Sequence, residues 1–188
     1  MNVFDLAIVV LFLVVFTVGF FSGFSRLVVA LISLFLGLVS ASIGYGGFAA
    51  VLMGAAPSMT DWTADVASFF VVTLIIGGLV FYAILWSFRV TALRTRHLLE
   101  WRGGTWGLIG LALLSVVLAV VVVTTAVQVS DWTVNQFPPS QNVTIAVRSS
   151  LQESILAANA MRLSPYLYDA VGAWVPGGPP PILKPAGG

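Results

Sequence analysis

Four stretches of this chain are long, apolar and free of charged side chains. They cover about residues 6–24, 27–48, 66–88 and 106–127, and none of them contains Asp, Glu, Lys, Arg or His. A transmembrane helix needs about 20 consecutive, mostly apolar residues. The central Leu, Ile, Phe and Val residues of such a segment favour insertion, and no charge opposes them here. The pattern therefore predicts an all-α integral membrane protein with a bundle of four transmembrane helices.

The overall composition agrees with a membrane protein. Hydrophobic residues make up 59% of the 188 residues and charged residues 8%, against roughly 45–50% and about 25% in soluble domains. Too few polar residues remain to cover four such helices in water. The net charge of +1 provides no basic field for nucleic acid. The chain has no cysteine, which excludes disulfides, thiolate nucleophiles and cysteine zinc sites.

The arginines between the apolar stretches predict an orientation. Short cytoplasmic loops are enriched in Lys and Arg. Five arginines flank the first and third joints, whereas the joint at 54–65 has none, and the segment before the first stretch lacks the basic residues of a signal peptide. We expect both termini outside the cytoplasm. Binding of lipid headgroups is the alternative role for these five arginines: Arg26, Arg89, Arg94, Arg96 and Arg102.

The chain changes character after the fourth stretch. Residues 130–175 form a mixed polar segment, in which apolar residues recur at four-residue spacing: Val143, Val147, Leu151 and Ile155. This spacing predicts an extracytoplasmic amphipathic helix on the membrane surface, with Ser140 as N-cap and Pro165 as its end. Residues 176–188 are rich in Pro and Gly and are predicted to be extended or disordered.

Glycines at four-residue spacing predict close helix packing at the cytoplasmic end. Gly19 and Gly23 end the first apolar stretch, and Gly103, Gly107 and Gly110 open the fourth. Small residues at this spacing let helix backbones approach closely in lipid. A hinge or a notch for a ligand is the alternative interpretation of the same spacing.

Two titratable residues are weighed as site residues. Asp5 precedes the first apolar stretch, where a carboxylate caps free amides and complements the helix dipole. The alternative role for Asp5 is contact with a partner. His97 is the only histidine and is interpreted as a solvated loop residue, with an axial ligand to haem or pigment as the unsupported alternative.

Catalytic motifs are absent from the sequence. No phosphate-binding loop, H-E-x-x-H or G-x-S-x-G motif occurs. Pumps and transporters usually place ionisable residues inside the membrane, and the four stretches contain none. We therefore expect a protein that is not an enzyme and has no catalytic residue, metal or cofactor of its own.

Short motifs carry a resemblance to a known family. Asn2-Val-Phe-Asp5 leads into a stretch that ends Gly19-Phe-Phe-Ser-Gly23-Phe-Ser-Arg26, and Arg102-Gly103 opens the last stretch. This order resembles the CvpA family, the colicin V production proteins of bacterial inner membranes, over roughly residues 1–129. Ser22 stands where the family often has Arg, and Trp101 where it has Asp.

The resemblance implies a role in colicin V-type toxin production or export, or in envelope maintenance. Its partners would be membrane lipids and other membrane subunits or a second copy, with no nucleic acid. One alternative function is an accessory transmembrane subunit of a larger complex. Another is a small oligomeric transporter or channel, with a polar pathway built from five hydroxyl side chains: Ser33, Ser40, Ser42, Thr73 and Ser115.

Overall fold

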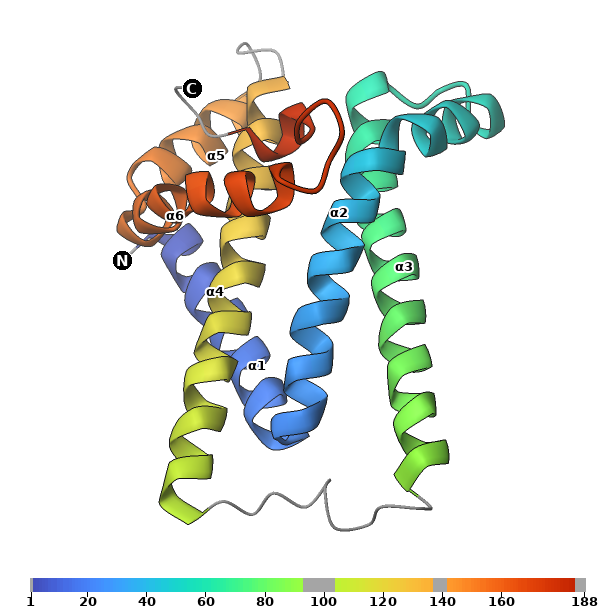
Figure 1. The fold of residues 1–188 in the computed structure, drawn as a ribbon. Coiled ribbons are helices and arrows are strands. Elements are labelled where there is room, and N and C mark those ends of the chain that lie inside the picture. Colours follow the sequence, from blue (N-terminus) through green and yellow to red (C-terminus); the bar gives the residue numbers. More distant parts are fainter. Residues whose placement is uncertain (1, 93–103, 137–141, 185–188) are drawn as a thin grey trace.

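The structure is a computed structural model that describes residues 2–92, 104–136 and 142–184. Throughout these ranges the ordered elements are helices and no strand occurs, which confirms the all-α prediction. Four of the helices are long and apolar enough to cross a membrane (Figure 1). The chain is therefore a multi-pass membrane protein.

Each predicted apolar stretch lies within one long helix: α1 is Val3–Ser22, α2 is Phe24–Ala55, α3 is Asp61–Ala92 and α4 is Gly104–Gln136. The last three have 32 or 33 residues each. At about 1.5 Å per residue they are nearly 50 Å long, more than the roughly 30 Å of a bilayer core. These helices must therefore extend beyond the hydrocarbon layer or bend.

A bend is visible in α2. Figure 1 shows the last part of α2 turning away from the axis of its first part, before the chain enters α3. The segment Gly44–Gly47 contains three glycines and lies within α2. Glycine-rich positions are common places for a helix to kink, so the chain accommodates its excess helix length at this end of the bundle.

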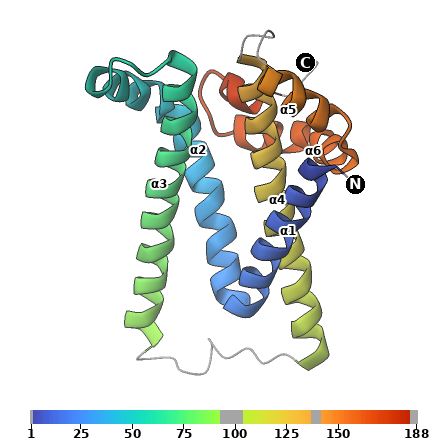
Figure 2. The same cartoon turned by 180° about the vertical axis from the view of Figure 1, so that it is seen from behind.

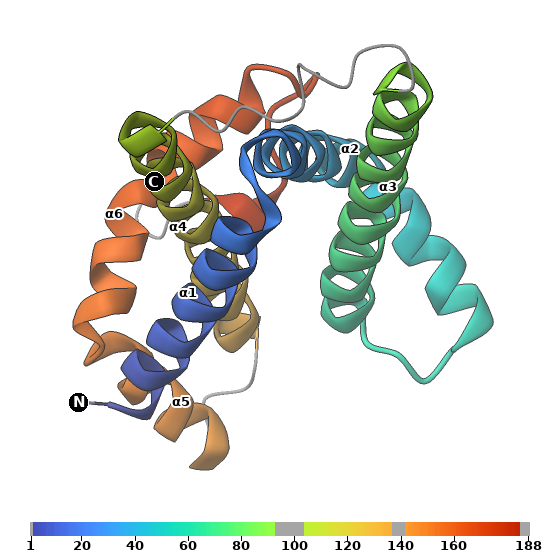
Figure 3. The ribbon, with the colours of Figure 1, turned by 90° about the horizontal axis from the view of Figure 1, so that it is seen from below.

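The four long helices form two pairs. α1 packs mainly against α4 and α2 mainly against α3, while α2 also contacts α4. Figure 2 shows the two pairs from behind, and Figure 3 shows α2 between the α1–α4 pair and α3. Only Gly23 separates α1 from α2. The two helices nevertheless diverge from this turn, because α1 finds its main partner in α4.

The closest helix contact joins α2 to α3 through two glycines. A Cβ atom at Gly37 would lie 2.7 Å from the Thr73 carbonyl oxygen, and one at Gly77 would lie 3.1 Å from the Ser33 carbonyl oxygen. The facing segments are Ser33-x-x-x-Gly37 and Thr73-x-x-x-Gly77. Small residues four apart remove the side-chain bulk between the helices, so the two backbones come into contact.

The C-terminal part forms a cap over one end of the bundle. We use the word cap for residues 142–184, which contain α5 (Asn142–Gln152), α6 (Ile155–Gly172) and a 3-10 turn, η1 (Pro181–Leu183) (Figure 1). The α5 side chain of Arg148 donates from Nη2 to the Val134 carbonyl oxygen (3.4 Å) and to Asn135 Oδ1 (3.3 Å). A cation at the C-terminal end of α4 also complements its dipole.

The prediction of one amphipathic helix ending at Pro165 is wrong in two respects. The segment forms two helices, and Pro165 lies inside α6. Proline lacks the N–H that would bond to the carbonyl four residues earlier, which here belongs to Met161. Ser164 Oγ donates to that same carbonyl at 2.9 Å. The serine hydroxyl replaces the missing donor, so α6 continues. Ser140 lies outside the described residues.

The stripe of four apolar residues predicted for that helix is divided among different environments. Leu151 is buried, whereas Val147 and Ile155 are exposed. The side chain of Val143 is not among those described. Ile155 does not share a helix face with the other three, because α5 ends at Gln152 and Ile155 begins α6, which has a different orientation.

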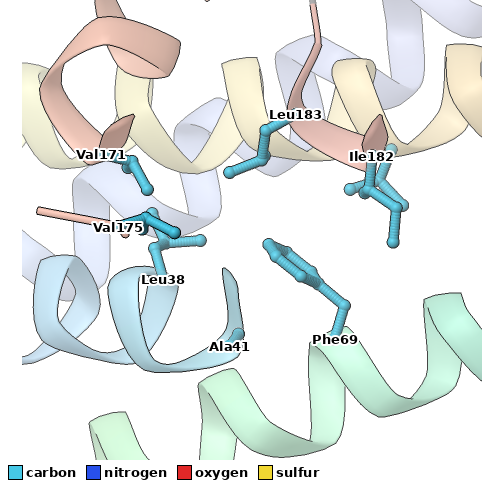
Figure 4. Packing of buried hydrophobic residues seen from close by; sticks show 8 residues of the cluster. Leu38, Ala41, Phe69, Val171, Val175, Ile182 and Leu183 are labelled. Carbon is cyan, nitrogen blue, oxygen red and sulfur yellow. The ribbon is translucent and has the colours of Figure 1, made fainter. Parts of the chain in front are cut away.

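Of the tail that was predicted to be extended or disordered, the structure describes residues 176–184, and part of it packs against the bundle. Gly177 and Gly178, both with φ of 89°, turn the chain back towards the bundle, and the 3-10 turn η1 follows. Ile182 and Leu183 are each 1% exposed. Figure 4 shows these two side chains facing Phe69 of α3. They complete a cluster that joins α2, α3, α4 and the cap: Leu38, Ala41, Phe69, Val129, Val171, Val175, Ile182 and Leu183.

Candidate functional site

Asp5 connects the first helix to the cap. Asp5 Oδ2 accepts a hydrogen bond from the Asn2 N–H at 3.3 Å, which is the capping role predicted from the sequence. Its other oxygen, Oδ1, accepts from Ser154 Oγ at 2.6 Å and from the Leu156 N–H at 3.2 Å. Asp5 is 8% exposed, and these bonds are all made within the chain.

Ser154 completes the junction by capping α6. Its hydroxyl donates to Asp5 and accepts from the Ala157 N–H at 3.0 Å. Asn2 Nδ2 also donates to the Ser150 carbonyl oxygen at 2.7 Å, which ties α5 to the start of α1. The N-termini of α1 and α6 both carry partial positive charge, so the single carboxylate of Asp5 stabilises both. We call these contacts the Asp5 junction.

An open pocket of about 640 Å³ lies beside this junction. Its lining includes Asn2, Asp5 and Glu153 together with two apolar side chains of α6, Ile155 and Leu156. Among the described residues no group of three His, Cys, Asp or Glu side chains is placed to hold a metal ion. The pocket therefore presents carboxylates and an amide to the solvent at the point where α1 meets the cap.

A second hollow lies between α2, α4 and α6, and we call it the cap groove. It has a volume of about 380 Å³ and, apart from Thr124 and the Tyr166 hydroxyl, its lining is apolar. Thr124 is buried and its hydroxyl has no hydrogen-bond partner. Eleven residues line the groove: Leu31, Leu34, Phe35, Leu38, Val120, Val121, Thr124, Leu163, Tyr166, Leu167 and Ala170.

A third hollow of about 260 Å³ lies near the turn between α1 and α2, at the end of the bundle away from the cap (Figure 1). Arg26 and Ser22 form its polar edge, while Val18, Phe81 and Leu118 are among its apolar lining residues. The structure thus places Arg26 at the rim of an apolar hollow. A cation in this position can interact with a lipid headgroup while its stem contacts apolar side chains.

The predicted glycines occupy different environments. A Cβ atom at Gly19 would lie 3.1 Å from Leu27 Cδ1 and 3.4 Å from Ser115 Oγ, so this glycine permits close packing. At Gly110 the nearest atom, Phe24 Cε2, would be 3.9 Å away, an ordinary contact. Gly103 lies outside the described residues.

Gly23 and Gly107 differ from the packing role expected of them. A Cβ atom at either position would meet no described atom within 4 Å. Gly23 is instead required by its backbone, because its φ of 85° lies in the region that residues with side chains rarely adopt. It allows α2 to begin with only one residue between it and the end of α1. Gly107 lies one turn into α4, facing open space.

The basic loop between α3 and α4 is mostly outside the described residues. This applies to Arg94, Arg96, His97 and Arg102, whereas Arg89 lies in α3 with its side chain not described. Their predicted roles in topology or headgroup binding stay predictions.

The hydroxyl residues of the channel hypothesis mostly bond to their own helices. Ser42, Thr73 and Ser115 each donate to the carbonyl oxygen four residues earlier, at 2.7–2.8 Å. Ser33 is buried without a partner beside the contact of α2 with α3. None of the five lines any of the three hollows described above.

Sequence reasoning missed the contacts that hold the cap. Ser154 follows Glu153 and precedes an apolar helix, so its capping role has a recognisable local signal. Its bond to Asp5 joins residues 149 positions apart, and no local pattern predicts it. The Ser33-x-x-x-Gly37 and Thr73-x-x-x-Gly77 segments have small residues four apart, the same spacing that predicted close packing at Gly19 and Gly23. This signal could have identified the contact of α2 with α3.

Comparison with known protein families gives a match over most of the chain. Residues 4–165 match the model of the family described as Colicin V production protein. No curated protein and no solved structure matches the chain. The match extends from the first turn of α1 into α6, so it includes all four spans and both ends of the bond between Asp5 and Ser154.

Proposed function

This chain belongs to the colicin V production protein family, and on that premise we propose that it is a non-enzymatic protein of the bacterial inner membrane. Its role would be to support production or export of a colicin V-type toxin, or to maintain the cell envelope. The observation that carries the proposal is the extent of the family match, which covers the entire four-helix bundle and the start of the cap.

A non-enzymatic role is supported by the chemistry of the side chains. The chain has no cysteine and one histidine, and charged residues make up 8% of it. The two hollows within the bundle have mainly apolar linings, with Thr124 and the Tyr166 hydroxyl in one and Ser22 and Arg26 in the other. Acid–base or nucleophilic catalysis needs paired polar groups that are held close together. The bundle is better suited to packing against lipid or protein.

The cap is proposed to face the extracytoplasmic side. Figure 1 shows the start of α1, the end of α4 and the cap at one end of the bundle, and the turn from α1 to α2 at the other. Arg26 belongs to that turn end. The positive-inside rule assigns a basic turn to the cytoplasm. The Asp5 junction and the cap would then meet the periplasm.

The test is complementation in a bacterium that carries colicin V and lacks its own family member. Expression of this chain should restore the amount of toxin released and the resistance of the cells to detergent. A Gly37→Leu variant, which blocks the contact of α2 with α3, should restore neither, while Gly78→Leu should behave as the parent protein. Equal toxin release and equal detergent resistance with and without the chain would contradict the proposal.

An accessory role in a larger complex is the second candidate. In the most apolar 18-residue segment of each span, at most 39% of the residues are buried inside the protein. In α1 only 17% of these residues are buried. These exposed apolar faces suit lateral packing against other membrane subunits as well as lipid. Purification in mild detergent should then retain a constant set of partner chains, whereas recovery of the chain alone from the native membrane would contradict this role.

A further inference from the structure

The cap groove lies between two of the candidate membrane spans and the cap. Its lining comes from the membrane-spanning parts of α2 and α4 and from one side of α6. Leu163, Tyr166 and Ala170 line it from α6, and all three are exposed. The groove is therefore open to its surroundings along α6. In a bilayer, the molecules that reach an apolar opening between membrane spans are lipid acyl chains.

The outer edge of the groove has the chemistry of a headgroup site. Tyr166 is 74% exposed, and a tyrosine ring with a free hydroxyl is typical of the membrane interface. Arg162 precedes it by one helical turn, so the two side chains are neighbours on the surface of α6. Arg162 is exposed and has no ion-pair partner in the part of the chain that the structure describes.

The apolar wall and the cation belong to one rigid element. The N-terminus of α6 is fixed to α1 by the Asp5 junction. α6 also contributes Val171 to the cluster around Ile182 and Leu183. The distance between Arg162 and the groove is therefore set by the fold, which distinguishes this site from the general lipid surface of the bundle.

We propose that the cap groove binds one acyl chain of an anionic phospholipid, whose phosphate is held by Arg162 and Tyr166. The guanidinium forms charge-assisted hydrogen bonds with phosphate oxygens, and the phenol donates a further hydrogen bond. An anionic lipid is favoured over phosphatidylcholine because no headgroup cation competes with Arg162. This lipid site goes beyond the proposed role in toxin production and does not depend on it.

The experiment is native mass spectrometry of the full-length protein in mild detergent. Phosphatidylglycerol and phosphatidylcholine with the same acyl chains are added in separate titrations. We expect the first bound phosphatidylglycerol to have an apparent affinity about tenfold higher than that of phosphatidylcholine. Equal affinities for the two lipids would overturn the headgroup part of the proposal.

Matched variants locate the site. Ala170→Trp fills the groove and should remove the tight phosphatidylglycerol site. Ala158→Trp is the control, since Ala158 is also exposed on α6 but does not line the groove. Arg162→Gln should abolish the preference for phosphatidylglycerol while leaving a weaker site for both lipids. A folded Ala170→Trp protein that binds phosphatidylglycerol like the parent, or an unchanged preference in Arg162→Gln, would overturn the proposal.

A measurement on the unsubstituted protein avoids any dependence on variant folding. Phosphatidylglycerol with a photoreactive group in one acyl chain is incorporated, illuminated and mapped by peptide sequencing. Adducts on residues 120–124 or 163–170 support the site. Adducts spread over the exposed faces of α1 and α3, with none on these two segments, would show general lipid contact only and overturn it.

Discussion

At the scale of single residues, Asp5 has the most consequences for the fold. One carboxylate accepts from the start of α1, from the Ser154 hydroxyl and from the start of α6. Capping its own helix is a local role that the sequence predicts. Holding α6 is a second role, and it requires α6 to arrive at the same place through α4 and α5.

Replacing Asp5 with Ala should loosen the cap without unfolding the bundle. The Leu156 N–H and the Ser154 hydroxyl lose their acceptor, so the first turn of α6 should open more often. Hydrogen exchange measured by mass spectrometry should therefore be faster in the peptide that contains Leu156. Asp61→Ala, at the exposed start of α3, is the control. Unchanged exchange in α6 would show that the junction does not hold the cap.

Gly37 shows how a residue without a side chain determines a helix contact. A Cβ atom there would lie 2.7 Å from the Thr73 carbonyl oxygen, closer than real Cβ atoms approach backbone. The neighbouring helix must move before any larger residue fits. Gly78 lies in the same helix pair, but a Cβ atom there would meet nothing within 4 Å. A substitution at Gly78 therefore changes the helix propensity without changing the packing.

Gly37→Ala should lower the stability of the protein, whereas Gly78→Ala should leave it unchanged or raise it. In a helix interior, Ala is favoured over Gly by up to about 1 kcal/mol, but overpacking typically costs about 1–3 kcal/mol. Thermal unfolding of both variants in the same detergent measures the difference. Equal Tm values for the two variants would contradict the assigned contact of α2 with α3.

At the scale of elements, α6 and η1 depart most from what the sequence pattern predicts. A proline normally ends or kinks a helix, and a proline-rich tail is normally extended or disordered. In α6, the Ser164 hydroxyl bonds to the carbonyl that Pro165 leaves without a donor. In η1, two apolar residues between prolines and a lysine insert into a core to which α2, α3, α4 and α6 contribute.

The role of Ser164 is tested by a double-mutant cycle. Ser164→Ala alone leaves the partly buried Met161 carbonyl without its donor and should cost about 1 kcal/mol, because an unsatisfied acceptor that is shielded from water is expensive. Adding Pro165→Ala restores a backbone N–H that can bond to the same carbonyl, so the double variant should recover most of the loss. Denaturant unfolding of the four proteins gives the coupling. Additive effects would contradict this assignment.

The burial of η1 predicts a large effect from a small truncation. Leu183→Ala removes a side chain that is 1% exposed, and such substitutions typically cost about 2–5 kcal/mol. The cap should then detach more readily, which limited proteolysis detects as faster cleavage between α6 and the C-terminus. Lys184→Ala, at the exposed next residue, should not change the rate. Equal cleavage of both variants would contradict the buried position of Leu183.

At the scale of the whole molecule, the main property is that the cap and the start of α1 share one end of the bundle (Figure 1). Four spans return the chain to the side on which it began. The cap then covers that end through Ser154, Arg148 and Leu183, which contact Asp5 of α1, the end of α4 and the core cluster respectively. The orientation in the membrane decides which compartment all these groups meet.

Cysteine labelling tests that orientation directly, because the natural chain has no thiol. Ser58→Cys lies in the exposed turn between α2 and α3, at the cap end of the bundle. An impermeant maleimide should label it in intact cells. Ser25→Cys, at the opposite end, should react only after the membrane is permeabilised. Labelling of Ser25→Cys but not of Ser58→Cys in intact cells would reverse the proposed orientation.

The sequence by itself determined the number and approximate position of the four spans. Hydropathy is a local property that sums along a segment, so stretches without charges, such as residues 66–88, identify transmembrane helices without any knowledge of their neighbours. The tight turn at Gly23 and the capping by Asp5 are also local. The motifs around Gly19 and Gly23 pointed to the family that the match over residues 4–165 confirms.

Only the tertiary structure decided which helices pair and what fastens the cap. The contact of Gly37 with Thr73, the bond of Asp5 to Ser154 and the burial of Leu183 all join segments that are remote in the chain. Each depends on the relative positions of whole helices rather than on a nearby pattern. A small, polar or apolar residue has many possible partners in a sequence, and packing in three dimensions selects one.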